Sequence, residues 1–167
     1  MKKNIFLTIG FILIIAATPA AAQSDDTAEF VKAAVANNMF QIQSSKALLT
    51  KSESELVRNF AQAISLDHAR SGKKMTALLN TSDKEYDVPQ RLDAEHQQKI
   101  DDLLAASTED IDTLYIEEQI AAHEKALALF DNYATEGDNP TWRGFASQSL
   151  PMLRMHENRA KRLQEME

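Results

Sequence analysis

The sequence predicts an all-α protein, and composition and patterning agree on this fold class. The 167 residues include only four Gly and four Pro, whereas residues that favour helices, such as Ala, Leu, Glu, Gln and Lys, are plentiful. Apolar residues recur every three or four positions over long stretches, which is typical of one face of a helix. No stretch shows the alternation expected of a strand. A chain of this length is expected to form one bundle of four long helices with an extra short connecting helix.

The helix around which this bundle is organised is predicted over residues 111–133. Its apolar face is broad, which is typical of a helix buried among other helices. Gln119 and His123 are two polar residues inside that face. Ser107 and Asp110 are expected to cap the start of this helix, and Gly137 is expected to terminate the helix.

The other helices are predicted from the same periodicity and from their capping residues. A capping box formed by Ser52 and Glu55 is expected to open the second helix, and Asn139 followed by Pro140 is expected to open the last one. Gly72 is expected to permit close packing against a neighbouring helix. The predicted ranges are 26–49, 52–80, 91–105 and from 139 to near the C-terminus.

The first 22 residues are predicted to be a secretory signal peptide. Lys2 and Lys3 precede an apolar run over residues 5–17, which is too short for a confident membrane span. The small residues Ala20, Ala21 and Ala22 then offer a cleavage site before Gln23. We therefore expect cleavage after Ala22, export to the bacterial periplasm and a single mature domain over residues 23–167. An uncleaved anchor is the alternative interpretation of the same run.

Charge and cysteine content exclude several classes of function. Loss of the two lysines of the signal peptide changes the net charge of the chain from −7 to about −9. An acidic chain without a basic cluster is unsuited to nucleic acid or to anionic lipid, so we expect neither as a partner and no membrane span after cleavage. The chain has no Cys, which excludes disulfides, thiolate metal sites and cysteine nucleophiles.

One polar residue lies near the centre of the apolar face of each long helix. These residues are Gln41, His68, His123 and His156, with Tyr115 and Gln119 close to His123 in sequence. At a rise of about 1.5 Å per residue, each histidine lies roughly 25 Å from the start of its helix, so the three could share one layer of the core.

Two interpretations of this polar layer are open. In the first, His68, His123 and His156 bind zinc or copper, with an amide or Tyr115 nearby. In the second, the histidines form a buried hydrogen-bond network with Gln41, Gln119, Tyr115, Ser149 or water, and this network fixes the packing register.

Other chemistry has less support. A carboxylate-bridged iron pair requires Glu-x-x-His motifs, but Ser65, Ile120 and Leu153 occupy the positions three before the histidines. No Gly-x-Ser-x-Gly turn or phosphate-binding glycine loop is present, and Asp67 is expected to project away from His68. No catalytic residue is therefore predicted.

The methionines give a weaker indication of copper. Met152 and Met155 flank His156, and thioethers suit cuprous copper. Core filling is the preferred interpretation of Met75 and Met152, because Met155 diverges from Met152 around the helix and Met39 is expected to point outward.

Nearly all of the mature chain resembles the bacterial family called domain of unknown function 4142. The residues that carry the resemblance are the Asp67-His68 pair, the spacing of Tyr115, Gln119 and His123, and the segment from Leu150-Pro151 to His156. They stand in the segments FVKAAVANNMFQIQSSKALL, VRNFAQAISLDH, VPQRLDAEHQQKIDDL, LYIEEQIAAHEKALALFDNYATEGDNP and FASQSLPMLRMHENRAKRL.

The resemblance implies a ferritin-like four-helix bundle and a location in the cell envelope, but no established reaction. The family usually carries Glu where this sequence has Gln41, so a negative charge is missing from the polar layer here. The function expected first is therefore a non-enzymatic, stress-related module of the envelope that binds an unidentified protein partner. The alternative is a zinc- or copper-binding protein that uses the three histidines.

Overall fold

The computed structural model describes residues 26–166, and within that range it contains five α-helices and no strand. The all-α fold class is therefore confirmed. The signal peptide expected over residues 1–22 lies outside the described residues. The helices are α1 (Asp26–Leu49), α2 (Glu55–Thr81), α3 (Ala94–Ala105), α4 (Ile111–Glu136) and α5 (Pro140–Gln164).

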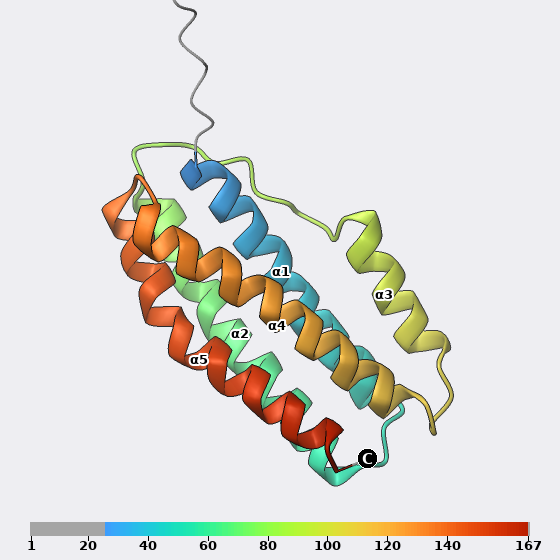
Figure 1. Cartoon of the computed structure of the whole chain (residues 1–167). Helices are drawn as coiled ribbons and strands as arrows, with labels where there is room; N and C mark the ends of the chain where they lie inside the picture. The colour runs from blue at the N-terminus through green and yellow to red at the C-terminus, as the bar shows by residue number, and fades with distance from the viewer. Residues whose placement is uncertain (1–25, 167) are drawn as a thin grey trace, which may run out of the picture.

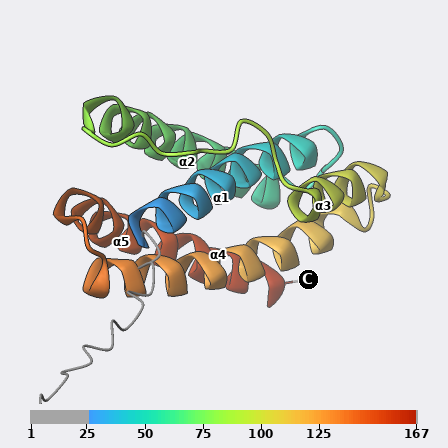
Figure 2. The ribbon, with the colours of Figure 1, turned by 90° about the horizontal axis from the view of Figure 1, so that it is seen from above.

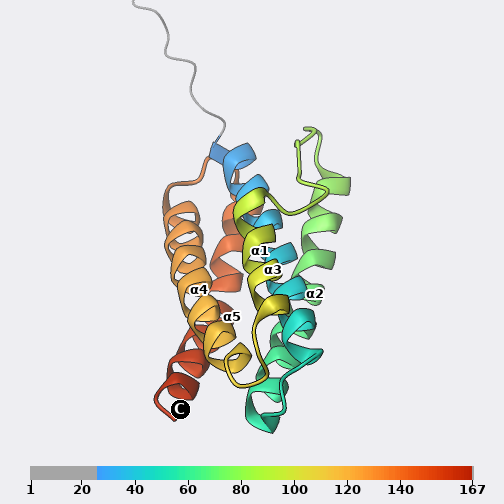
Figure 3. The same cartoon turned by 90° about the vertical axis from the view of Figure 1, so that its right-hand side faces the viewer.

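The four long helices lie side by side as two antiparallel pairs (Figure 1). α1 and α2 form one pair, and α4 and α5 form the other. Residues 82–110 connect the pairs and contain α3, which runs along the outside of the molecule. Viewed from above, α3 lies beside α1 and α4, on the side away from α5 (Figure 2). Figure 3 shows α3 in front of α1, with α4 and α2 to either side.

The starts of the helices are set by side chains that accept hydrogen bonds from free backbone N–H groups. Asn139 caps α5 through Oδ1, which accepts from the N–H groups two and three residues on, as its sequence predicts. The predicted capping box at Ser52 is wrong. Ser54 caps α2 instead, and Ser52 is buried, with an Oγ that has no partner in the described chain. Asp93 caps α3, which therefore begins later than residue 91.

The two ends of α4 also differ in detail from their prediction. Asp110 occupies the N-cap position without a side-chain cap, because its carboxylate bonds the Ser107 hydroxyl at 2.6 Å. The helix continues to Glu136, three residues beyond its expected end. Gly137 follows as predicted, and its N–H donates to the carbonyl of Tyr133 at 3.0 Å.

The core consists of two apolar clusters separated by the polar layer. On α2, the cluster containing Phe60 and Ile64 precedes His68, and Met75 of the other cluster follows it. On α4, Tyr115 and Ile116 precede the layer and Phe130 follows it. On α1 and α5, which run in the opposite direction, the two clusters follow in the reverse order. The polar residues therefore occupy the middle of the bundle and not one of its ends.

A third, smaller apolar cluster joins α3 to the bundle. Phe40 of α1, Leu92, Ile100 of α3 and Ala122 of α4 are buried together, and Met39 packs partly buried against them. The expectation that Met39 points outward is therefore wrong. Met75 is buried, as expected for core filling, and Met155 is exposed. Among the described helices, none has the length and apolar character that a membrane crossing requires.

Two glycines give a matched test of the packing. A Cβ at Gly137 would lie 2.6 Å from both the backbone oxygen and the ring of Tyr133, whereas a Cβ at Gly144, inside α5, would meet nothing within 4 Å. We expect Gly137→Ala to lower the free energy of unfolding by about 1–3 kcal/mol because of this overlap. Gly144→Ala should raise it by up to about 1 kcal/mol through helix propensity. Urea unfolding followed by circular dichroism measures both, and equal effects would contradict the packing at Gly137.

Candidate metal centre

Three histidines from three helices meet in the polar layer. His68 belongs to α2, His123 to α4 and His156 to α5, and their exposed fractions are 3%, 0% and 1%. Their ring centroids are 5.3–5.8 Å apart. One ring nitrogen of each lies within 4.8 Å of the corresponding nitrogens of the other two. The depth deduced from helix rise therefore places them correctly in one layer. We call this group the histidine cluster.

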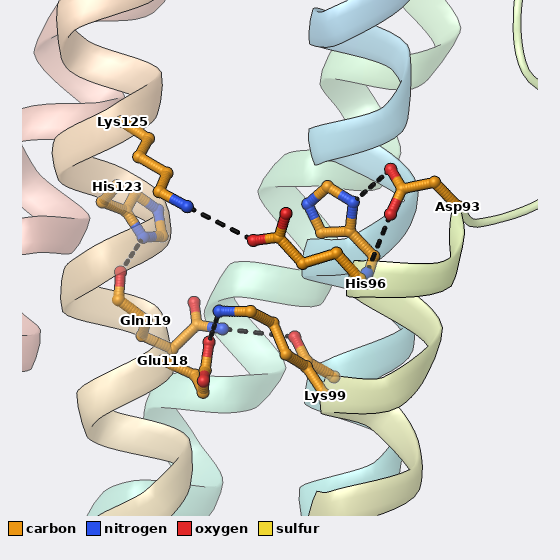
Figure 4. Close-up of polar contacts among 9 residues, drawn as sticks. Asp93, His96, Lys99, Glu118, Gln119, His123 and Lys125 are labelled. Carbon is orange, nitrogen blue, oxygen red and sulfur yellow. Dashed lines mark hydrogen bonds and ion pairs between the residues drawn. The ribbon is translucent and has the colours of Figure 1, made fainter.

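Two of the rings are oriented by oxygen acceptors on their outer side. The Nδ1 of His68 lies 3.2 Å from Oδ1 of Asn38, on α1. The Nδ1 of His123 lies 2.8 Å from the carbonyl oxygen of Gln119, one turn earlier in α4 (Figure 4). Because an oxygen acceptor requires a donor, these contacts place the imidazole proton on Nδ1 and leave Nε2 with a lone pair.

The third ring is oriented by a carboxylate from another helix. The Nε2 of His156 lies 3.2 Å from Oδ2 of Asp67, whose other oxygen accepts from Arg70 at 3.1 Å. From the sequence alone no inward acid is identified beside any histidine, and this contact shows that interpretation to be wrong. Asp67 does project away from His68, but this direction takes it to α5. The contact places the proton of His156 on Nε2 and the lone pair on Nδ1.

Each ring has one further nitrogen that the outer contacts leave unused. The Nε2 of His68, the Nε2 of His123 and the Nδ1 of His156 are buried and have no hydrogen-bond partner among the described residues. Atoms no more than 4.8 Å apart all lie within about 2.8 Å of a common point, whereas zinc–imidazole bonds measure about 2.0–2.1 Å. Coordination of one ion therefore requires side-chain shifts of less than about 1 Å.

Burial favours the neutral form of each ring. It lowers the pKa of His123 to about 4, although the carbonyl of Gln119 opposes the shift. The pKa of His68 is held well below its ordinary value by burial and then by the neighbouring histidines. The pKa of His156 is lowered by burial, with Asp67 opposing. Neutral imidazole is the form that binds metal, so the cluster needs no deprotonation near neutral pH.

The other polar residues of the layer do not satisfy the histidines. Gln41 is fully buried, and neither its Oε1 nor its Nε2 has a partner in the described chain. The side chain of Gln119 donates to Ser44 at 3.2 Å, and the Tyr115 hydroxyl is 2.9 Å from that of Ser45. The Ser149 hydroxyl donates to a carbonyl of its own helix. These four side chains were the expected partners of a histidine network, and none of them bonds a histidine ring.

Sequence reasoning missed the two side chains that orient His68 and His156. The helical repeat that includes Gln41 predicts that Asn37 faces inward, but Asn38 is the buried residue and Asn37 is only partly buried. Gly72 explains how Asn38 fits, because a Cβ there would lie 3.0 Å from the Asn38 amide nitrogen. The partner of Asp67 is 89 positions away, so no local pattern reveals it.

The fourth histidine of the chain belongs to a different environment. His96 of α3 bonds Asp93 at 2.7 Å (Figure 4). Its ring centroid lies 5.0 Å from that of Phe40. The sequence predicts that His96 is exposed, because it lies outside the apolar residues of its helix, but its side chain is only partly exposed. Its proton acceptor is a surface carboxylate, and it is not a member of the histidine cluster.

A solved structure shares this fold. The crystal structure of a DUF305 fragment from Deinococcus radiodurans superposes with a TM-score of 0.71 and covers 87% of this chain and 99% of that one, at 17% sequence identity. At this identity the likeness shows the fold alone. Comparison with curated protein sequences gives no match.

The sequence pattern of one protein family extends over most of the chain, including all three histidines. The profile described as "Domain of unknown function (DUF4142)" matches residues 15–163, and the chain therefore belongs to this family.

Proposed function

We propose that this protein binds one transition-metal ion, zinc or copper, through His68, His123 and His156. The observation that carries the proposal is that three buried histidines each bring a ring nitrogen within 4.8 Å of the others, while each ring also keeps one buried nitrogen without a partner in the described chain. A buried polar atom without a partner costs about 1–3 kcal/mol, and three such atoms in one cluster are accounted for by a shared cation. A protein-interaction module alone leaves them unexplained.

The outer contacts of the rings support the same function. Histidines that bind metal usually donate their other N–H to a carboxylate or a backbone carbonyl, which fixes the ring and strengthens the ligand. Asp67 and the Gln119 carbonyl are contacts of this kind, and the amide of Asn38 serves the third ring. A set of imidazoles without a carboxylate suits zinc and copper better than magnesium, calcium or manganese.

The proposal includes a location and a role. Export through a signal peptide cut after Ala22 and a ferritin-like arrangement of the four long helices would make this a metal-binding module of the periplasm. The rings are at most 3% exposed, so the centre offers no room for an organic substrate beside the ion. We infer that the protein holds or buffers its metal and does not use it in catalysis.

Metal content tests the proposal directly. The mature protein, purified without an affinity tag and equilibrated with Zn²⁺ or with anaerobic Cu⁺, should retain one ion per chain in elemental mass spectrometry. His123→Ala should lose the ion because one of three ligands is gone. His96→Ala, which removes a histidine outside the cluster, should bind as the wild type does. Equal binding by the two variants would show that the metal lies elsewhere, and no binding by the wild type would end the proposal.

The buried histidines also predict how the metal-free protein responds to acid. The unfolded chain has the ordinary histidine pKa of 6.5, whereas the pKa of folded His123 is about 4. Between these values the unfolded state binds more protons. The contribution of His123 to the free energy of unfolding is therefore complete above pH 6.5. It falls by about 1.4 kcal/mol per pH unit as the pH drops toward 4. The lowered pKa values of His68 and His156 act in the same direction. Urea unfolding at pH 7, 6 and 5 checks this, and stability that rises with acid would contradict it.

Asp67 provides a test that leaves the three ligands in place. Asp67→Asn preserves the size of the side chain but removes the charge that strengthens His156 as a ligand, so metal affinity should fall about 10- to 100-fold. Asp131→Asn is the control, because Asp131 pairs with Arg154 on the surface of α4 and α5 and has no contact with the cluster. Competition with a chromogenic chelator measures both affinities. Equal affinities for these two variants would exclude an orienting role for Asp67.

A further inference from the structure

We propose that the metal ion reaches the histidine cluster between α2 and α5, past the thioethers of Met152 and Met75, and that this path favours cuprous copper. The inference rests on the metal binding proposed above and adds to it an access route and a choice of ion.

The outer part of the path is a surface groove between α2 and α5. Its volume is about 260 Å³. Asp67, the residue that bonds His156, forms part of its wall, so the groove begins beside the cluster. The α2 side is completed by Arg70, Ser71 and Lys74, and the α5 side by Gln148, Ser149 and Met152.

The inner part is a small cavity that touches His68. Its volume is about 10 Å³, close to the space of one water-sized probe. Met75 lies in its wall, and Met75 is only 3% exposed. Groove and cavity share three lining residues, Ser71, Ser149 and Met152. These three residues, which we call the neck, therefore lie between the groove and the cavity beside His68.

The opposite side of the bundle is closed at the same level. The two helix pairs meet along two lines of contact, α1 with α4 and α2 with α5 (Figure 2). α3 covers the first, where Phe40, Ile100 and Ala122 are buried together next to Gln41 and His123 in sequence. The larger groove of about 920 Å³ on that side contains none of the three clustered histidines. Within residues 26–166, no further helix covers the α2–α5 line.

The side chains of the path distinguish between ions. Thioether sulfur is a soft donor that suits Cu⁺ and is a poor ligand for Zn²⁺. In the neck, the Ser149 hydroxyl is already committed to the Phe145 carbonyl at 2.8 Å, so the sulfur of Met152 is the freer donor. Sulfur from Met75 follows deeper in the path. A Cu⁺ ion can therefore exchange water for thioether and then for imidazole.

The charges at the mouth of the groove act in the same direction. Arg70 and Lys74 line it together with one carboxylate, Asp67, which Arg70 already pairs. The excess positive charge repels a divalent ion about twice as strongly as a monovalent one, since Coulomb energy scales with ionic charge. The desolvation cost of bringing an ion into a buried centre of three neutral imidazoles is likewise smaller for a single charge than for a double one.

Metal-loading kinetics test the route. Metal-free protein is mixed anaerobically with Cu⁺ held by a chromogenic chelator, or with Zn²⁺ held by a zinc indicator, and the transfer is followed by absorbance. Met152→Leu removes the sulfur at nearly constant volume, so the fold should persist. We expect it to slow Cu⁺ transfer about tenfold or more, with the Zn²⁺ rate and the final stoichiometry unchanged. Met155→Leu is the matched control, because Met155 is 52% exposed and lies outside groove and cavity; it should load as the wild type does.

A second variant tests the path itself. Ser71→Leu adds bulk in the neck while leaving all three histidines in the sequence, and it should slow the transfer of both ions. Wild-type Cu⁺ rates in both Met152→Leu and Ser71→Leu, with one ion still bound, would overturn the route and leave the metal site standing. Slowing of both ions alike by Met152→Leu would overturn the selection of copper. A wild-type protein that takes up neither ion would overturn the metal site and the route together.

Discussion

The structure depends on a layer of neutral, buried imidazoles between two apolar clusters. Each ring is held by one hydrogen bond that it donates on its outer side, to Asn38, to the Gln119 carbonyl or to Asp67. Those bonds fix both the tautomer and the direction of the remaining lone pair. Large side chains such as Trp142 and Phe60 are fully buried on either side of the layer and offset the cost of placing polar rings there. Burial of these apolar side chains therefore compensates the free-energy cost of burying the polar layer.

Helix periodicity made much of this architecture predictable. The bounds of α1 and the common depth of the three histidines follow from a 3.6-residue repeat and a fixed rise, which depend on local geometry alone. Caps were less predictable. Ser52 and Ser54 are both suitable N-cap residues, and only the path of the backbone into α2 decides which of them caps the helix. The apolar contact between Met39 and α3 also escaped, since it depends on where the connection over residues 82–110 places that helix.

The candidate site also has one part that local helix geometry predicts and one part that it does not. Its three ring positions are readable from sequence, because an inward polar residue breaks an otherwise apolar face. The outer partners are not readable, because they depend on the rotation of one helix against another: Asn38 replaces Asn37, and Asp67 serves a ring on α5. These outer contacts are what separate the two interpretations of the layer. A closed network among protein groups would use both nitrogens of each ring, whereas one nitrogen of each ring has no partner among the described residues.

The crossover connection gives the bundle two unlike sides. Two antiparallel helix pairs packed together have two lines of contact, and α3 covers the one between α1 and α4 (Figure 3). On that side Phe40 and Ala122 are buried together with Ile100 of α3, whereas on the α2–α5 side the neck residues line both the surface groove and the cavity beside His68. The contact between α2 and α5 can open without separating α1 from α2 or α4 from α5. A buried centre that must exchange an ion needs such an asymmetry, because a core closed equally on all sides could be loaded only by unfolding.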